Sequence, residues 1–322
     1  MKTIVSAFCL AAVLFLLSAV SALACDFCLL SQGISPLETL SGAGVRVNER
    51  YTSLDKVYNG THKTTNPGAR EEFWTTEVTG FYAVTEDLMV LGVVPFKTTR
   101  MKGELIVNPD GTVDLDPMRG TESGLGDVAV IGRYAFLRRH TIDTTTTLAA
   151  LLGVKFSTGK TDGKADNGEF LDSHIQLGTG STDYIIGASL NHATGKLSIS
   201  ANLLGTLTTD GKFGDTKHRF GNALNYDLTA KYRVYPTETG PGEAQFFVAL
   251  GVNGELRDRE KVDDVKDPDS GGHTVYLSPG LQAVVSPHLV FELSYQKAIY
   301  HNLYGVQLGE DYKATGGVTY LF

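Results

Sequence analysis

The chain has 322 residues, a formal net charge of −8 and a mean hydropathy of −0.05. An acidic chain lacks the basic face that phosphate backbones require, so nucleic acid is excluded as a main partner. The long apolar run at the N-terminus has no equal elsewhere, which excludes several membrane-spanning helices, because each needs about 20 apolar residues. A membrane β-barrel is not excluded, because its strands are apolar on one face only.

The first 24 residues have the features of a secretory signal peptide. Basic Lys2 is followed by an apolar stretch that ends in the small-residue pattern of a cleavage site. A retained helical anchor is the alternative, but the apolar stretch is short for a membrane span. Removal of residues 1–24 leaves residues 25–40 as a periplasmic N-terminal segment or plug, and residues 41–322 as one domain.

Two cysteines, Cys25 and Cys28, stand at the expected new N-terminus as Cys-Asp-Phe-Cys. In an oxidising compartment such a pair most simply forms a local disulfide, and lipidation of Cys25 is the alternative. A c-type haem needs a histidine directly after the second cysteine, where Leu29 stands. Two thiolates without a nearby histidine are also a poor metal site. The sequence therefore predicts no cofactor and no metal.

From about residue 43 onward, apolar and polar residues alternate in runs of about ten, separated by turn-rich stretches. In the clearest run, 225–234, one face carries only apolar or aromatic side chains and the other is polar and charged. Twelve such strands are predicted, at about 43–53, 71–84, 88–99, 127–137, 145–156, 181–191, 197–208, 220–235, 244–257, 273–285, 289–300 and 312–322. An even number suits an all-β, closed antiparallel transmembrane β-barrel with both termini on one side.

The connections between the predicted strands alternate between short turns and longer polar loops, as in outer-membrane barrels. The last long connection is predicted at residues 301–311. The third strand is apolar on both faces over residues 88–96, and we expect its inner face to be covered by the N-terminal segment or a loop.

The C-terminus resembles the terminal strand that the barrel-assembly machinery recognises. Phe322 is the last residue, and Tyr320 lies on the same face of an alternating strand. These features, together with the signal peptide, predict a barrel in the outer membrane of a Gram-negative bacterium, in contact with lipid and lipopolysaccharide.

Several glycine-rich segments resemble one family of outer-membrane barrels, the phenol-degradation meta-pathway type. They are Gly124-Leu125-Gly126-Asp127, residues 152–162 (LGVKFSTGKTD), residues 178–184 (GTGSTDY) and residues 277–282 (LSPGLQ). The resemblance covers most of residues 41–322 and implies a barrel, while saying little about its cargo. The export channel of functional amyloid subunits is similar over the barrel only.

If the apolar faces meet lipid, thirteen charged side chains line the lumen, eight of them basic and five acidic. They are Arg46, Arg50, Glu77, Arg133, Lys155, Asp183, Asp227, Lys231, Arg233, Glu255, Arg257, Glu292 and Lys313. Two interpretations remain open: a pore that weakly prefers anions or polar solutes, and a narrow barrel whose charges pair across the lumen.

The sequence carries no HExxH or GxSxG motif, and no enzyme is predicted. Six carboxylates between Asp258 and Asp269 do not match an EF-hand and are interpreted as a solvated loop. The predicted function is a passive channel for small hydrophobic or polar compounds. The alternative is a non-conducting structural or docking barrel for a periplasmic or surface secretion or electron-transfer component, contacted through Cys25 and Cys28. Either is compatible with a homo-oligomer.

Overall fold

The structure is a computed structural model that describes residues 42–108, 112–237 and 243–322. The predicted signal peptide, the segment 25–40 and the cysteines Cys25 and Cys28 lie outside the described residues.

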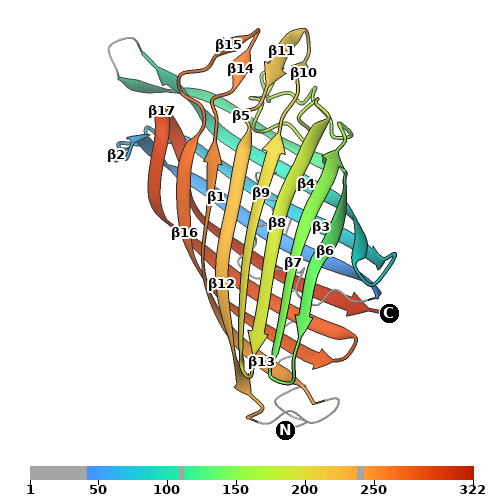
Figure 1. Cartoon of the computed structure of the whole chain (residues 1–322). Helices are drawn as coiled ribbons and strands as arrows, with labels where there is room; N and C mark the ends of the chain where they lie inside the picture. The colour runs from blue at the N-terminus through green and yellow to red at the C-terminus, as the bar shows by residue number, and fades with distance from the viewer. Residues whose placement is uncertain (1–41, 109–111, 238–242) are drawn as a thin grey trace.

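The described residues form one closed antiparallel β-barrel (Figure 1). Each strand pairs with its sequence neighbour in the wall, and β17 pairs with β1 to close the ring. The wall is built from β1 (Ala43–Gly60), β3 (Arg70–Ala83), β4 (Leu88–Val107), β6 (Ala129–His140), β7 (Thr144–Lys155), β8 (Asp183–Thr194), β9 (Leu197–Leu207), β12 (Ala223–Tyr235), β13 (Gln245–Arg257), β16 (Gly272–Ser286) and β17 (Leu289–Leu321).

β17 contributes two antiparallel passes to the barrel wall. Its first part pairs antiparallel with β16 up to Leu303, and its second part pairs antiparallel with β1. The direction reverses beside Gly305, whose φ of 67° suits a tight turn. Tyr295 and Tyr312, from the two parts, stack with ring centroids 5.6 Å apart. The eleven labelled strands of the described wall therefore make twelve passes, because a closed ring of antiparallel neighbours needs an even number.

The prediction of a long connection at residues 301–311 is wrong. These residues belong to β17, and only a short turn beside Gly305 joins its two passes. The polar residues that suggested a loop continue the strand ladder instead: Gln307 pairs with Tyr58 of β1, and Lys297 forms an ion pair with Asp311 across the turn.

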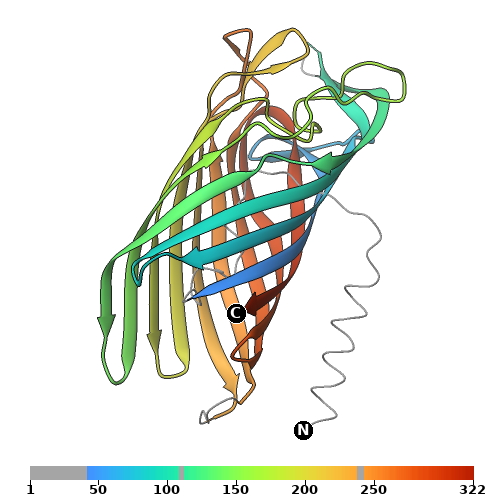
Figure 2. The same ribbon diagram turned by 90° about the vertical axis from the view of Figure 1, so that its right-hand side faces the viewer.

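The shorter strands lie at one end of the barrel, opposite the C-terminus (Figure 1). β2 (His62–Thr64) pairs with β1, and β5 (Val113–Leu125) pairs with β4 in an extended hairpin. A separate small sheet is formed by β10 (Gly211–Phe213), β11 (Thr216–Arg219), β14 (Lys261–Val262) and β15 (Val265–Lys266). In Figure 2 this end is covered by loops, whereas the opposite end has short turns. The alternation predicted from the sequence thus places all long connections on one side.

The outer surface of the barrel is an apolar belt. Leu152, Ile186 and Leu228 are each more than half exposed, although they are large aliphatic residues. Exposed aromatic residues stand near the end that holds the C-terminus, among them Tyr82, Tyr134, Phe136, Tyr232 and Tyr320. A belt of this kind, edged by aromatic rings, faces lipid in outer-membrane barrels. Among the described residues, no helix is long and apolar enough to cross a bilayer.

The interior of the barrel has two different walls. The wall from β3 to β9 holds a buried apolar cluster: Phe81, Met89, Leu91, Val93, Ala129, Ile131, Leu151, Ile185 and Leu204. The wall from β12 through β17 to β1 is mostly polar and charged. The inward side chains of β4 pack against those of the neighbouring strands in this cluster. The N-terminal segment that we expected to cover them lies outside the described residues.

Candidate functional site

The thirteen charged residues predicted to line the lumen lie on strands, and most are buried although the outer surface is apolar. Ten are at most 9% exposed: Arg46, Arg50, Glu77, Arg133, Lys155, Asp183, Asp227, Lys231, Glu292 and Lys313. Arg233, Glu255 and Arg257 are partly exposed. Buried charges are tolerated only when they are paired or hydrogen-bonded, so their partners define the interior.

A chain of polar contacts crosses the polar wall. The Nζ of Lys231 on β12 donates a hydrogen bond to Oε1 of Gln282 on β16 over 3.2 Å, and Nε2 of Gln282 donates to Oε1 of Glu292 over 2.9 Å. The other oxygen of Glu292 lies 2.8 Å from Nη2 of Arg46 on β1. These contacts link side chains that are far apart in the sequence along one side of the lumen.

Other predicted lining residues pair with residues that are close in the sequence. Lys313 lies 2.7 Å from a carboxylate oxygen of Glu310 and 4.6 Å from the ring centre of Tyr276. Arg257 donates from Nε to Glu255 over 2.8 Å. The pairing of these charges supports the narrow, charge-filled interpretation over part of the lumen.

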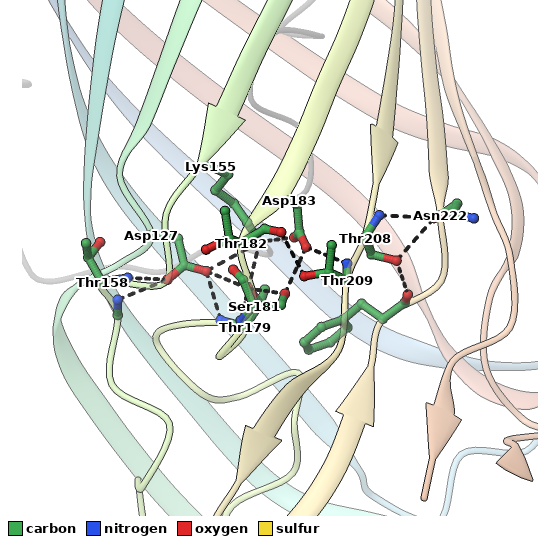
Figure 3. A network of polar contacts seen from close by, with 12 residues as sticks. Asp127, Lys155, Thr158, Thr179, Ser181, Thr182, Asp183, Thr208, Thr209 and Asn222 are labelled. Atoms are coloured by element: carbon green, nitrogen blue, oxygen red, sulfur yellow. Dashed lines mark hydrogen bonds and ion pairs between the residues drawn. The ribbon is translucent and has the colours of Figure 1, made fainter. Parts of the chain in front are cut away.

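A buried ionic network lies where β6, β7 and β8 meet the long loop 156–182 (Figure 3). Lys155 Nζ lies 2.6 Å from Asp183 Oδ2 and 3.3 Å from Asp127 Oδ2, and it donates to the hydroxyl of Thr179 over 2.7 Å. Asp127 also accepts hydrogen bonds from the backbone nitrogens of Thr158, Gly159 and Thr179. Both ends of the loop are therefore fastened to the barrel wall by one carboxylate.

Two glycines let the ends of this loop touch. A Cβ atom on Gly159 would lie 2.6 Å from Cα of Gly178, and one on Gly178 would lie 2.4 Å from the carbonyl oxygen of Gly159. Real Cβ contacts are almost never this short, so a side chain at either position would push the two backbone segments apart. This close approach explains why glycines stand at these two positions in the segments that carry the family resemblance.

The middle of the loop 156–182 packs against the inner face of the barrel. Leu171 and Ile175 are buried in an apolar cluster with Phe73 of β3 and Met101 of β4. The hydroxyl of Thr99 on β4 donates to the carbonyl oxygen of Ile175 over 2.5 Å. Because these side chains of β3 and β4 point inward, the loop narrows the lumen at its outer end.

Three long loops meet at one carboxylate at the outer end of the barrel. Glu260 is 2% exposed, and its two oxygens lie 3.3 Å from Nε2 of His174 and 3.1 Å from Nε2 of His218. Partial burial alone would lower the pKa of His174, but the carboxylates of Glu260, Asp172 and Glu71 raise it to about 9.

Burial alone would raise the pKa of Glu260, but His174, a hydrogen bond from His218 and nearby Arg257 together lower it. The interpretation of residues 258–269 as a uniformly solvated loop is therefore wrong for Glu260. No local sequence pattern reveals this contact, since its three members come from separate loops. Across the described residues, no group of His, Cys, Asp and Glu is arranged to hold a metal ion.

The predicted assembly signal lies at the seam of the barrel. The backbone nitrogen of Phe322 donates to the carbonyl oxygen of Ala43 over 2.9 Å. Tyr320 and Phe322 are 51% and 74% exposed, and their rings contact each other edge to face. The two rings are thus presented on the outer surface at the end of the chain.

The sequence profile of the family described as "Putative MetA-pathway of phenol degradation" matches residues 48–303. The chain belongs to this family. The match covers the barrel from β1 into β17, including the segments that hold Asp127, Lys155 and Asp183. No curated protein sequence matches the chain.

A solved structure shows the same fold for this family member. An outer membrane channel from Pseudomonas putida F1 is similar with a TM-score of 0.68 and 14% sequence identity, covering 90% of this chain and all of that one. The NanC porin (TM-score 0.41, 14% identity, 87% and 100% coverage) and the P. putida toluene transporter TodX (0.39, 8%, 92% and 94%) are more distant. At this identity the first match establishes the closed outer-membrane barrel fold. The fold, the family and the apolar belt together place the chain in the outer membrane.

Proposed function

We propose that this barrel is a passive channel for small compounds that have both an apolar and a polar part. The observation that carries this proposal is the two-sided interior, in which the apolar cluster on β3 to β9 faces a wall of hydrogen-bonding side chains. Such a solute exchanges water for an apolar surface on one side and keeps polar partners on the other. The similar outer membrane channel from Pseudomonas putida F1 agrees with a role in solute passage.

Planar-bilayer recording and liposome flux test the proposal. Purified protein is expected to give an open-state current, and liposomes that contain it are expected to take up phenol faster than protein-free liposomes after correction for passive diffusion. Absence of current and of protein-dependent flux would contradict a channel.

Neighbouring residues on β7 supply a matched pair of variants. Leu151 is 2% exposed and belongs to the inner apolar cluster, whereas Leu152 is 65% exposed on the lipid side. Leu151→Asn is expected to lower the phenol-to-glycerol flux ratio roughly threefold to tenfold, because it removes about 1 kcal/mol of apolar contact. Leu152→Thr is expected to leave that ratio unchanged. Equal effects of the two variants would speak against passage along the apolar wall.

The alternative is a non-conducting docking barrel, and one observation favours it: paired charges and the inward-packed loop 156–182 both narrow the lumen. A barrel that stays closed to ions when this loop is released, but binds a periplasmic partner through residues 25–40, would support this role. A relation to the functional-amyloid export channel stays a prediction from the resemblance, and secretion of an amyloid subunit from cells that carry this barrel would test it.

A further inference from the structure

A pocket of about 300 Å³ opens at the end of the barrel that holds the C-terminus, away from the loops. The β3–β4 turn and the inner face of β6 line it, with Ala83, Asp87, Met89, Arg133 and Arg138 among its walls. Its size is at the lower end of the range for sites that hold small ligands. It lies apart from the ionic network and the loop cluster at the outer mouth.

Arg133 is the buried charge of this pocket. It is 4% exposed, and its Nε has no hydrogen-bond partner. Lys155 and Arg46 are buried to the same degree, but carboxylates lie within 2.8 Å of both. Within the described residues, no carboxylate forms an ion pair with Arg133. A buried guanidinium without a counter-ion is costly, so its environment is complementary to an anion.

The surroundings of Arg133 indicate what kind of anion fits. On the flanking strands the residues directly opposite are Met89 of β4 and Leu151 of β7, and both belong to the inner apolar cluster. The guanidinium thus stands at the edge of an apolar surface. Carboxylates match the fork of a guanidinium with two parallel hydrogen bonds.

The acidic residues of the turn do not neutralise this charge. Asp87 pairs with Arg138 over 3.3 Å, and both side chains are close to half exposed. Glu86 also lines the pocket but is exposed on the turn. The three rim residues Glu86, Asp87 and Arg138 therefore sum to a formal charge of −1, but none of them forms an ion pair with Arg133, which lies buried inside.

We propose that Arg133 and the apolar surface beside it form a binding site for a small organic carboxylate with an apolar body, at the periplasmic mouth of the barrel. The carboxylate pairs with the guanidinium, and the apolar body lies against Met89 and Ala83, which line the pocket. The site deepens the proposed channel function by naming a solute class, and it rests on that function for its role. Binding itself does not depend on conductance.

Calorimetric titration of the folded barrel in detergent tests the site, with empty micelles as the blank. The probes are benzoate, its neutral analogue benzyl alcohol, and inorganic phosphate. Benzoate is expected to bind saturably, and at least tenfold more tightly than benzyl alcohol, because a charge-assisted pair is lost in the alcohol. Phosphate is expected to bind more weakly than benzoate, because it has no apolar body.

Arg133→Gln is expected to weaken benzoate binding tenfold or more, while Arg133→Lys, which keeps the charge but loses the fork, weakens it less. Arg139→Gln is the matched control, since Arg139 lies on the same strand with an exposed side chain and does not line the pocket. Gel migration of unboiled against boiled protein checks that each variant is folded, and Arg133→Lys replaces Arg133→Gln in the comparison if the latter does not fold.

Four results would overturn the site: no saturable benzoate binding, equal affinity for benzyl alcohol, tighter binding of phosphate, or benzoate affinity unaffected by both Arg133 variants. Conductance measured on the same preparations separates this outcome from a failure of the channel. A conducting barrel without benzoate binding refutes the site alone, and a binding barrel without current refutes the channel alone.

Discussion

Asp127 and Thr179 are 52 positions apart in the sequence, yet Oδ2 of Asp127 accepts hydrogen bonds from both the backbone nitrogen and the hydroxyl of Thr179, over 2.8 and 2.7 Å. The same carboxylate holds the other end of the loop at Gly159. Both ends of the loop 156–182 are therefore anchored through one side chain.

Asp127→Asn is expected to release this loop. The variant removes the charge and replaces one acceptor oxygen by a donor that faces other donors, at a cost of roughly 3 kcal/mol for the lost charge-assisted hydrogen bonds. Trypsin should then cleave faster at the exposed Lys160 and Lys164 of the loop, and any open-state current should rise. Asp215→Asn is the control, since Asp215 is exposed in a different loop. Unchanged cleavage would contradict the anchoring role.

Gly159→Ala is expected to separate the two ends of the loop without removing any polar group. The new methyl group would overlap the backbone of Gly178, so the segment must shift by several tenths of an ångström or more. We expect faster cleavage at Lys160, as for the Asp127 variant. Gly80→Ala is the control, because a Cβ there meets no atom within 4 Å. Similar cleavage rates in the two alanine variants would count against a required close approach.

The contact between His174 and Glu260 should depend on pH. The pKa of His174 is raised, so its contribution is complete below about 6.5 and is lost as the pH rises through about 9. The pKa of Glu260 is lowered, so its contribution is complete above about 4.5 and is lost as the pH falls through the lowered value. Asp172 and Glu71 also face His174 and favour its charged form, and Arg257 opposes it.

Hydrogen exchange of the loop peptides, corrected for intrinsic rates, measures this dependence. Protection is expected to be highest between about pH 4.5 and 6.5 and lower at pH 10. The change should be modest, about 0.5–1 kcal/mol, because 38% of the His174 side chain is exposed and solvent screens the pair. Glu260→Gln should remove most of the dependence, and Asp215→Asn, an exposed loop position, should preserve it. A flat profile in the wild type would contradict a pH-dependent contact between His174 and Glu260.

Deletion of Phe322 is expected to lower the yield of folded barrel in the outer membrane severalfold. The exposed terminal ring, together with Tyr320, is the predicted signal for the assembly machinery. Phe136→Ser is the control, since it removes an exposed aromatic ring from the lipid-facing belt without changing the C-terminus. The measurement is the fraction of membrane-bound protein that migrates faster when unboiled. Equal losses in the two variants would argue for lipid contact alone.

The sequence was sufficient for the wall of the barrel because the side-chain period of a strand is local. On β12, outward Leu and Tyr side chains alternate with inward polar ones, and the other wall strands show the same alternation of inward and outward side chains. The extension of the last two passes to a tight turn beside Gly305 was missed because residues 301–311 are polar, although strands beyond the membrane have no need of an apolar face.

The candidate site was less predictable, since its contacts join residues far apart in the chain. The sequence placed Lys155 and Asp183 among the charged strand residues, but their meeting with Asp127 and Thr179 depends on how the loop folds back. The burial of Glu260 could not be predicted either, because its partners come from other loops and nothing in the sequence distinguishes it from the other acidic residues of its own loop. The unpaired state of Arg133 emerges only when the neighbouring strands are in place.

The seam between β1 and β17 runs from Gly44 opposite Leu321 to Gly60 opposite Leu303. Among the described residues, β1 and β17 cover each other's edge along this seam. A backbone edge left open in lipid costs several kcal/mol per unpaired group. A chain that lacks the last twenty residues would leave the edge of β1 unpaired, and we expect it to be unstable in the bilayer. We therefore expect closure of this seam, and not insertion of any single strand, to complete the entry of the barrel into the membrane.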